Sequence, residues 1–487
     1  MSGKNGNKWK QASLIGIGLV VGVSLSLNFT ASAERRSPLL PLPYEDMRVF
    51  SDVFNRIKTD YVEPVEDKKL LKEAINGMLA GLDPHSAYLD KDAYKNLNES
   101  MEGQFEGLGI QVDMDETGFV KVVSPIEGTP AARAGIKPGD YIIKLDDTAV
   151  KGLKLDEAVK KMRGPRGTSI TLTVMRKTEP KPLIITLTRE PIRTQSVISK
   201  QIEPGFAHIR VTQFQKPTGP DLAAALEDAY KKNPGGLKGL VLDLRNDPGG
   251  LLPTAIGVSA AFLPENALVV TSDGQVDDAK AKYLANRKYY QPGFANDYLS
   301  RIPAAVKTVP MVVLVNNGSA SASEIVAGAL QDHKRAVVIG TQTFGKGSVQ
   351  TIVPLNDETA IKLTTARYFT PNGRSIQAKG ITPDYLVEEA NPRIGAIREA
   401  DLERHLSNPA DGKTDPVAEA AAKAIRLEAA KIEAAKADAA KAKEVVEKNP
   451  DGTDKEKPDL QLEQAMNYLK GLPVVASSVA KTSSLVK

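Results

Sequence analysis

The sequence predicts a multidomain α/β protein in which an α/β core follows a small β-rich module, with helical regions at both ends. The chain of 487 residues exceeds the size of one compact core and indicates about three modules. Residues 195–387 alternate apolar strands with helices, as in 239–244 followed by 252–262, which is typical of an α/β core. Residues 104–190 contain instead short strands, with a single helix at 155–162.

The amino terminus has the pattern of a secretory signal. Three lysines in the first ten residues precede an apolar run at 12–27, and Ala-Ser-Ala at 31–33 forms a small-residue cleavage site. We interpret residues 1–33 as a signal peptide that exports the chain to the periplasm. The alternative is an uncleaved anchor, which would be the only means of membrane association. The run of about sixteen residues is short for the roughly twenty that cross a bilayer.

Helical regions are predicted on both sides of the middle of the chain. Residues 34–103 contain two segments, 44–63 and 66–82, with apolar residues at spacings of three and four, as in amphipathic helices. Residues 391–487 form the carboxy-terminal region, where Ala, Lys and Glu dominate 417–447. These residues favour a helix but provide few large apolar side chains to bury in a core, so we expect a solvated helix or a mobile tail there.

Composition excludes several classes of function. The net charge of +4 is small against 64 basic and 60 acidic residues, so no strong field favours nucleic acid as a partner. The chain has no cysteine, which rules out a disulfide framework, a thiol nucleophile and a thiolate zinc site. We expect neither a metal nor a cofactor.

Glycines mark the start of the β-rich module at 104–190, which opens with Gly107, Leu108, Gly109 and Ile110. Together with the segment PAARAGIKPGD at 130–140, this loop resembles that of a bacterial PDZ domain. The resemblance implies that the loop N–H groups bind a peptide's terminal carboxylate while the peptide adds as a strand, with apolar tails preferred. The alternative is that these glycines only form tight turns.

A serine-rich turn is the first candidate for chemistry. An apolar strand at 311–315 runs into a small-residue turn, and a helix begins near Ser321. The unpaired N–H groups of such a helix start point toward negative charge, so acyl-transfer enzymes place a nucleophilic serine there. The alternative is a plain capping box formed by Ser321 and Glu324, which any helix start can carry.

The search for a base to activate this serine leads to a lysine. None of the four histidines is followed by glutamate, and no serine has a G-x-S-x-G elbow, so the common zinc and Ser-His-Asp motifs are absent. We expect His85 and His333 to be structural. Lys346 lies between two glycines on a predicted turn, and burial can lower a lysine pKa until the neutral amine accepts a serine proton.

These motifs resemble those of the carboxy-terminal processing, or tail-specific, serine protease family. The matching segments are LDPHSAYL at 82–89, LDLRNDPGG at 242–250, SASASE at 319–324 and TFGKGSVQ at 343–350. The resemblance implies a crotonase/ClpP-like α/β protease core at 191–390. It also implies that Ser321 is the nucleophile, Lys346 the base and Gln350 the residue that orients the base.

Further roles follow from the same resemblance. The oxyanion hole would be the N–H of Ala322 together with one from Gly249 or Gly250, without a choice between the two glycines. Arg163, at the end of the helix at 155–162, resembles a position that couples tail binding to the active site. The alternative is a helix-terminal cation that faces water.

The remaining assignments concern ion pairs, partners and competing functions. We expect Asp243 and Arg245 to form a structural ion pair. Expected partners are protein substrates with apolar carboxyl termini and further copies of the chain, and the need for an activating adaptor stays open.

Two other functions compete with proteolysis: a non-catalytic adaptor for peptide tails, and an acyl-transfer or hydratase enzyme on a crotonase-like core. The intact Ser321, Lys346 and Gln350 argue against the first, and the PDZ-like module argues against the second.

Overall fold

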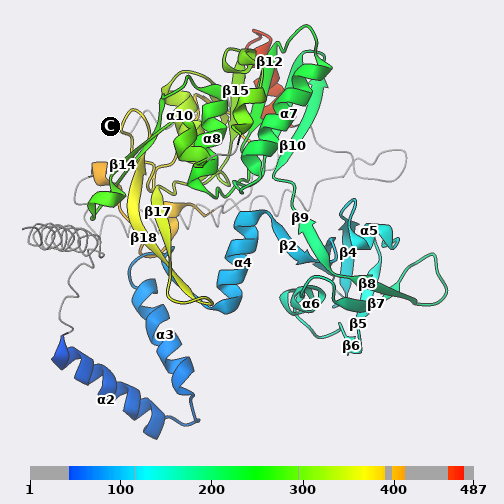
Figure 1. Ribbon diagram of the computed structural model, residues 1–487, viewed down its shortest axis with the longest axis vertical. Helices are drawn as coiled ribbons and strands as arrows, with labels where there is room; N and C mark the ends of the chain where they lie inside the picture. The colour runs from blue at the N-terminus through cyan, green and yellow to red at the C-terminus, as the bar shows by residue number, and fades with distance from the viewer. Residues whose placement is uncertain (1–42, 116, 294–295, 390–396, 412–458, 476–487) are drawn as a thin grey trace, which may run out of the picture. The chain divides into compact units, whose positions relative to one another are not determined.

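The computed structural model describes residues 43–115, 117–293, 296–389, 397–411 and 459–475 (Figure 1). The chain divides into two compact units, Met1–Ala74 and Ile75–Lys487. The predicted signal peptide at 1–33 and the Ala/Lys/Glu-rich tract at 417–447 lie outside the described residues, so both stay predictions. Within the described ranges, no helix has the length and hydropathy needed to cross a bilayer.

The two amphipathic helices predicted near the amino terminus are present. They are α2 (Tyr44–Asp60) and α3 (Asp67–Ala80), and the boundary between the two units falls within α3. Helix α2 has acidic residues in its first turn and Lys58 in its last turn, which complements the helix dipole. No side chain of α2 is buried, so its apolar residues, such as Met47 and Val53, remain exposed.

The predicted β-rich module folds as an antiparallel sheet with two helices. The sheet runs in the order β3-β4-β5-β7-β8, with β6 paired to β5. Its elements are β3 (Ile110–Met114), β4 (Val120–Pro125), α5 (Pro130–Arg133), β5 (Tyr141–Leu145), β6 (Thr148–Ala149), α6 (Leu155–Met162), β7 (Ser169–Met175) and β8 (Leu183–Thr188). The module has its own core, in which Val120, Ile142 and Leu172 are fully buried. A two-stranded stem, β2 (Gln104–Gly107) and β9 (Glu190–Arg193), connects it to the rest of the unit.

A mostly parallel sheet forms the α/β core. Its order is β10-β11-β12-β15-β16-β19, and only the β10 to β11 pair is antiparallel. The strands are β10 (Val197–Glu203), β11 (Phe206–Val211), β12 (Gly239–Asp243), β15 (Met311–Val315), β16 (Val337–Gly340) and β19 (Tyr385–Leu386). Strands β12 and β15 are buried at every position, as expected for parallel strands covered on both faces.

Helices cover this sheet on both faces. Helices α7 (Thr218–Lys232), α8 (Leu252–Phe262) and α10 (Ala322–Asp332) pack over one face, where Leu240, Leu242 and Val313 contribute to the main core (Figure 1). Helix α12 (Leu460–Leu469) packs against side chains of the opposite face, including Val312 and Leu314. The period-two alternation of each strand therefore divides the core into two layers.

A second, antiparallel sheet brings the lysine motif close to the amino-terminal motif. Its order is β1-β18-β13-β14, and β17 also pairs with β18. The strands are β1 (Ala87–Leu89), β13 (Leu268–Gly274), β14 (Ala281–Leu284), β17 (Ser348–Pro354) and β18 (Ala360–Phe369). The unit also contains helices α4 (Lys91–Glu102) and α9 (Arg287–Tyr290). Because β1 pairs with β18 in register Ala87 to Lys362, the segment before β1 lies beside the strands that follow Lys346.

Candidate active site

Ser321 occupies a strained position at the start of α10. Its backbone has φ 53° and ψ −108°, which is uncommon for a residue with a side chain and recurs at functional sites. The Ser321 N–H donates to Glu324 Oε2 at 2.7 Å, so the predicted capping role of Glu324 is confirmed. Ser321 itself is half-buried at the point where the turn after β15 enters the helix.

Asp247 supports the serine turn from the neighbouring loop after β12. Its carbonyl oxygen accepts hydrogen bonds from the N–H of Ala320 at 3.0 Å and from Ser323 Oγ at 2.9 Å. Its carboxyl Oδ1 accepts the N–H of Gly249 at 2.8 Å. Burial raises the pKa of the Asp247 carboxyl to about 8. One buried residue therefore fixes the serine turn and the glycine turn together.

The glycine turn lies against the serine turn, as expected for an oxyanion hole. A Cβ on Gly249, which has φ +95°, would lie 2.9 Å from Ala322 N and 3.0 Å from Ser321 Cβ. The Gly249 N–H is already engaged by the carboxyl described above. The N–H groups of Gly250 and Ala322 donate no hydrogen bond within the part of the chain that the structure describes. These two N–H groups can therefore stabilise a developing oxyanion.

Glu324 joins the serine turn to the lysine loop. Besides the N–H of Ser321, its Oε2 accepts the N–H of Lys346 at 2.9 Å. Its Oε1 accepts Thr343 Oγ1 at 2.5 Å and the N–H of Gly345 at 2.7 Å. Burial raises the pKa of this fully buried carboxyl to about 7, and the four hydrogen bonds oppose the rise. The backbones of Ser321 and Lys346 therefore bind the same carboxylate oxygen.

Lys346 lies in an environment that disfavours its charged form. Burial is the main cause that lowers its pKa below the ordinary value of 10.5, and the charge of Lys362 lowers it further. The carboxyl groups of Glu399, Glu324 and Asp83 oppose this shift. Within the described residues, no hydrogen bond or ion pair holds the Lys346 ammonium group. The direction of the shift agrees with the expected role of a neutral amine.

Gln350 lies near the lysine loop without bonding to the lysine. Its Nε2 donates to Ser348 Oγ at 2.9 Å and to Thr364 Oγ1 at 3.3 Å. Neither Gln350 nor Ser321 forms a hydrogen bond to Lys346 within the described ranges. Two hydroxyl groups therefore hold the Gln350 amide beside the lysine loop.

The predicted ion pair between Asp243 and Arg245 is confirmed, and it has a further partner. Arg245 donates to Asp243 Oδ1 and Oδ2 at 2.9 and 2.7 Å, and it donates to Asp459 at 2.7 Å from each of two nitrogens. His208 Nε2 lies 3.0 Å from Asp243 Oδ2. These hydrogen bonds hold the pKa of both carboxyl groups below their ordinary range. Asp459 directly precedes α12, so these bonds attach α12 to the end of β12 and to the loop that continues to Gly250.

The predicted carboxylate loop joins β2 to β3, which end at Gly107 and begin at Ile110. The carbonyl of Leu108 accepts the N–H of Ala131 at 3.0 Å, which ties the loop to the start of α5. The N–H groups of Leu108 and Gly109 donate to no acceptor within the residues described here. They can accordingly bind a ligand carboxylate.

Arg163 contacts the connection between the β-rich module and the core. Its guanidinium lies 4.7 Å from the ring centre of Phe105 in β2, and its Nη1 lies 3.4 Å from Glu99 Oε2 in α4. Both partners belong to the segment between β1 and the module. A ring and a carboxylate contact the side chain, which is also 40% exposed to solvent. Whether Arg163 couples the two sites stays a prediction.

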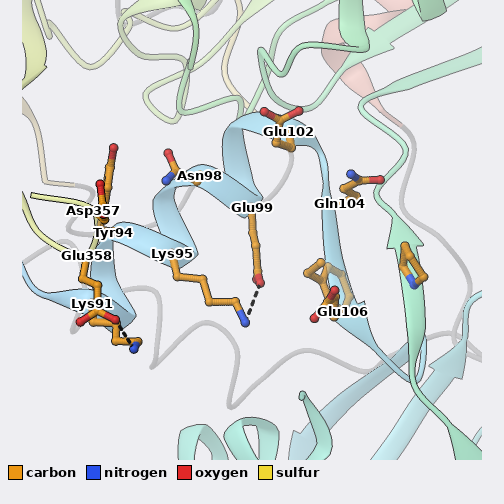
Figure 2. A pocket seen from close by; sticks show the side chains of 12 residues that line it. Lys91, Tyr94, Lys95, Asn98, Glu99, Glu102, Gln104, Glu106, Asp357 and Glu358 are labelled. Atoms are coloured by element: carbon orange, nitrogen blue, oxygen red, sulfur yellow. Dashed lines mark hydrogen bonds and ion pairs between the residues drawn. The ribbon is translucent and has the colours of Figure 1, made fainter. Parts of the chain in front are cut away.

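A groove of about 620 Å³ adjoins this connection (Figure 2). Figure 2 shows Lys95 turned toward Glu99 in α4, and Lys91 toward Glu358 in the β17 to β18 hairpin. The lining residues are Lys91, Tyr94, Lys95, Asn98, Glu99, Glu102, Gln104, Phe105, Glu106, Pro191, Asp357 and Glu358. Neither Ser321 nor Lys346 lines it, so the groove is separate from the candidate chemistry.

Sequence reasoning missed Glu399 and Asp459, and it gave Glu324 only a capping role. The first two belong to no motif and lie far along the chain from the residues they contact: Glu399 is 55 residues from Phe344, and Asp459 is 214 residues from Arg245. No local signal identifies them. His85, expected to be structural, has its Nε2 2.8 Å from Glu399 Oε2. His333 donates from Nε2 to the carbonyl of Leu268 at 2.7 Å, in agreement with a structural role.

Comparison with known families adds an independent line of evidence. The model described as Peptidase family S41 matches residues 205–387, and the PDZ domain model matches 121–176. The model described as the N-terminal domain of the activating protease CtpB matches 25–93. The first two matches fall within the ranges predicted for the core and the β-rich module, and the third overlaps both the helical amino-terminal region and the end of the predicted signal peptide.

Individual relatives carry related names. The carboxy-terminal-processing protease of Bartonella bacilliformis is 48% identical over 355 residues, which cover 72% of this chain and 76% of the relative. The carboxy-terminal processing protease CtpA of Bacillus subtilis is 35% identical over 373 residues, with 76% and 75% covered. Among solved structures, a photosystem II D1 C-terminal processing protease is 30% identical, with a TM-score of 0.40 and coverage of 71% and 87%.

Proposed function

The chain belongs to peptidase family S41, as a carboxy-terminal processing protease with a PDZ domain, and we propose that it uses a Ser-Lys dyad. Ser321 is the nucleophile and Lys346 is its base. The observation that carries this proposal is the shared carboxylate of Glu324, whose Oε2 binds the backbone N–H of both residues. This arrangement brings the two motifs to one point of the core.

The proposed reaction begins with proton transfer from the Ser321 hydroxyl to the neutral amine of Lys346. The serine oxygen attacks the substrate carbonyl, and the N–H groups of Ala322 and Gly250 stabilise the resulting oxyanion. We prefer Gly250 to Gly249 because the N–H of Gly249 is occupied. The ammonium of Lys346 then donates its proton to the leaving amine, and water releases the acyl group in a second cycle.

Gln350 completes the proposed site as the residue that orients Lys346. Its neutral amide can accept a hydrogen bond from the amine, whereas a carboxylate at this position would stabilise the ammonium and raise the lysine pKa. Gln350 bonds to Ser348 and Thr364, so the proposal requires its side chain to turn toward Lys346.

The PDZ domain would select substrates by their carboxyl termini. Peptides with apolar tails would add as a strand beside β3, with their carboxylate on the N–H groups of Leu108 and Gly109. The free N–H groups of this loop support the assignment. The amino-terminal pattern supports export to the periplasm, where such tails would belong to exported proteins. Assembly into homo-oligomers and control by an activating adaptor remain further parts of the proposal.

Two substitutions test the dyad directly. Ser321→Ala should abolish cleavage of a peptide with an apolar tail while leaving its binding to the PDZ domain intact, which also separates a protease from a tail-binding adaptor. Lys346→Arg should be inactive because a guanidinium does not deprotonate, whereas the exposed Lys282→Arg serves as a control. Near wild-type turnover of folded Lys346→Arg would show that another residue activates Ser321.

A further inference from the structure

The loop that carries Lys346 is held from outside the protease core. Glu399 is fully buried in the segment 397–411, beyond the region at 205–387 that matches the peptidase family. Its N–H donates to the carbonyl of Phe344 at 3.1 Å, two residues before the lysine. This contact fixes one side of the lysine loop.

The Glu399 carboxylate is linked to the other side of the loop through a buried glutamine. Glu399 Oε1 accepts Gln377 Nε2 at 2.8 Å, and Gln377 Oε1 accepts the N–H of Gly347 at 3.1 Å. Gln377 is fully buried, so both bonds are shielded from water. Glu399 therefore anchors the residues that flank Lys346 on both sides.

His85 supplies the remaining partner of this carboxylate from the opposite end of the chain. Its ring Nε2 lies 2.8 Å from Glu399 Oε2, and its backbone N–H donates to Asp83 Oδ1 at 2.8 Å. The same Asp83 oxygen accepts Thr364 Oγ1 at 3.0 Å, and Thr364 in turn receives the amide of Gln350. The amino-terminal segment thus reaches the residues proposed to orient the base.

We propose that Glu399 and His85 are positioning residues for the Lys346 base, so that segments before and after the protease core complete its active site. This inference rests on the proposed dyad. A purely structural buried pair would stabilise the fold without affecting the chemistry of the lysine. The bonds on both sides of Lys346 distinguish the positioning role, because they fix the loop at the reacting group.

The charges that face Lys346 determine how this role can be measured. Lys362 in β18 disfavours its ammonium form, and the carboxyl groups of Glu399, Glu324 and Asp83 favour it. His85 contacts two of these carboxyl groups: its Nε2 lies near Glu399 Oε2, and its backbone N–H donates to Asp83 Oδ1. Removing the charge of Glu399 should therefore lower the pKa of Lys346. Activity rises with pH as Lys346 loses its proton, so this rising limb of the pH profile should move to lower pH.

Glu399→Ala should lower kcat by about tenfold to a hundredfold, the usual loss when a catalytic group is misplaced by about an ångström. KM and tail binding should change less than about twofold, because the PDZ domain is untouched. Glu399→Gln keeps the side-chain shape and should shift the rising limb of kcat/KM to lower pH. His85→Gln should lower kcat, and the exposed Glu403→Gln on the same segment is the matched control.

Each variant is measured for cleavage of a peptide with an apolar tail between pH 5 and 10, and for its folded fraction by denaturant unfolding. Wild-type kcat in folded Glu399→Ala would overturn the inference, as would an unmoved pH limb in Glu399→Gln. The folded fraction is measured at each pH and activity is expressed per folded enzyme, so partial unfolding does not move the limb. An active Lys346→Arg would refute the dyad, whereas an inactive Lys346→Arg with a fully active Glu399→Ala would refute only the positioning role.

Discussion

Replacing Glu324 with glutamine removes one of the two carboxylate oxygens that join the serine turn to the lysine loop. A glutamine amide has only one oxygen that can accept hydrogen bonds. Its NH2 group replaces the other carboxylate oxygen and therefore faces the two donors that this oxygen accepted. The least costly orientation places NH2 at the position of Oε1, because the Thr343 hydroxyl can turn while the Gly345 N–H cannot. The bonds to Ser321 and Lys346 then survive.

We expect Glu324→Gln to lower the free energy of unfolding only moderately and to lower kcat more strongly. One buried N–H, that of Gly345, loses its acceptor, which costs about 1 to 3 kcal/mol. Gly345 directly precedes Lys346, and a displacement of about 1 Å at the base should lower kcat by about a hundredfold. Activity should therefore fall more than the loss of folded protein explains.

The pH dependence of stability gives a second measurement on the same variant. Burial raises the pKa of Glu324 from 4.5 to about 7, so the folded state retains a proton that the unfolded state loses. The stability from this group is fully present below about pH 4.5 and declines as pH rises through about 7. Glu324→Gln should lack this decline, and the exposed Glu463→Gln should keep it.

The assay combines kcat and KM on a peptide with an apolar tail with denaturant unfolding across pH 4 to 9. Wild-type turnover in folded Glu324→Gln would refute the claim that this carboxylate holds the base. A stability profile identical to that of the parent protein would refute the assignment of the titration to Glu324.

Three further predictions concern the PDZ domain and the carboxy-terminal helix. Amidating the terminus of an apolar-tailed peptide should weaken its binding by about 1.5 to 3 kcal/mol, and equal affinities of acid and amide would contradict a carboxylate loop. Arg163→Ala should alter basal activity or its stimulation by apolar-tailed peptides, and unchanged values of both would exclude the coupling role. Asp459→Asn should lower stability at pH 7 by about 1 kcal/mol. Because the pKa values of Asp459 and Asp243 are lowered by folding, this contribution is present above about pH 3.9 and is lost as pH falls further, as acid unfolding of both proteins should show.

Local patterns in the sequence predicted much of the architecture. The helix at 155–162 has the predicted bounds, because it is fixed by periodicity and by the turns that flank it. The family was recognisable from short segments around Ser321 and Lys346, because the proposed reaction needs a serine nucleophile and a lysine base at these positions. The ion pair of Asp243 with Arg245 was also predictable, since its members are two residues apart.

The sequence by itself therefore determined the fold class, the family and the candidate residues of the dyad. Only the tertiary structure decided what holds them: Glu324 between two loops, Glu399 on both sides of Lys346, and Asp459 on Arg245. It also showed that a hydrogen bond to Asp247 occupies the N–H of Gly249, which is the reason for proposing Gly250 in the oxyanion hole. The physical reason is that these bonds join segments separated by up to hundreds of residues, and their geometry depends on how the sheets and loops pack rather than on any local pattern.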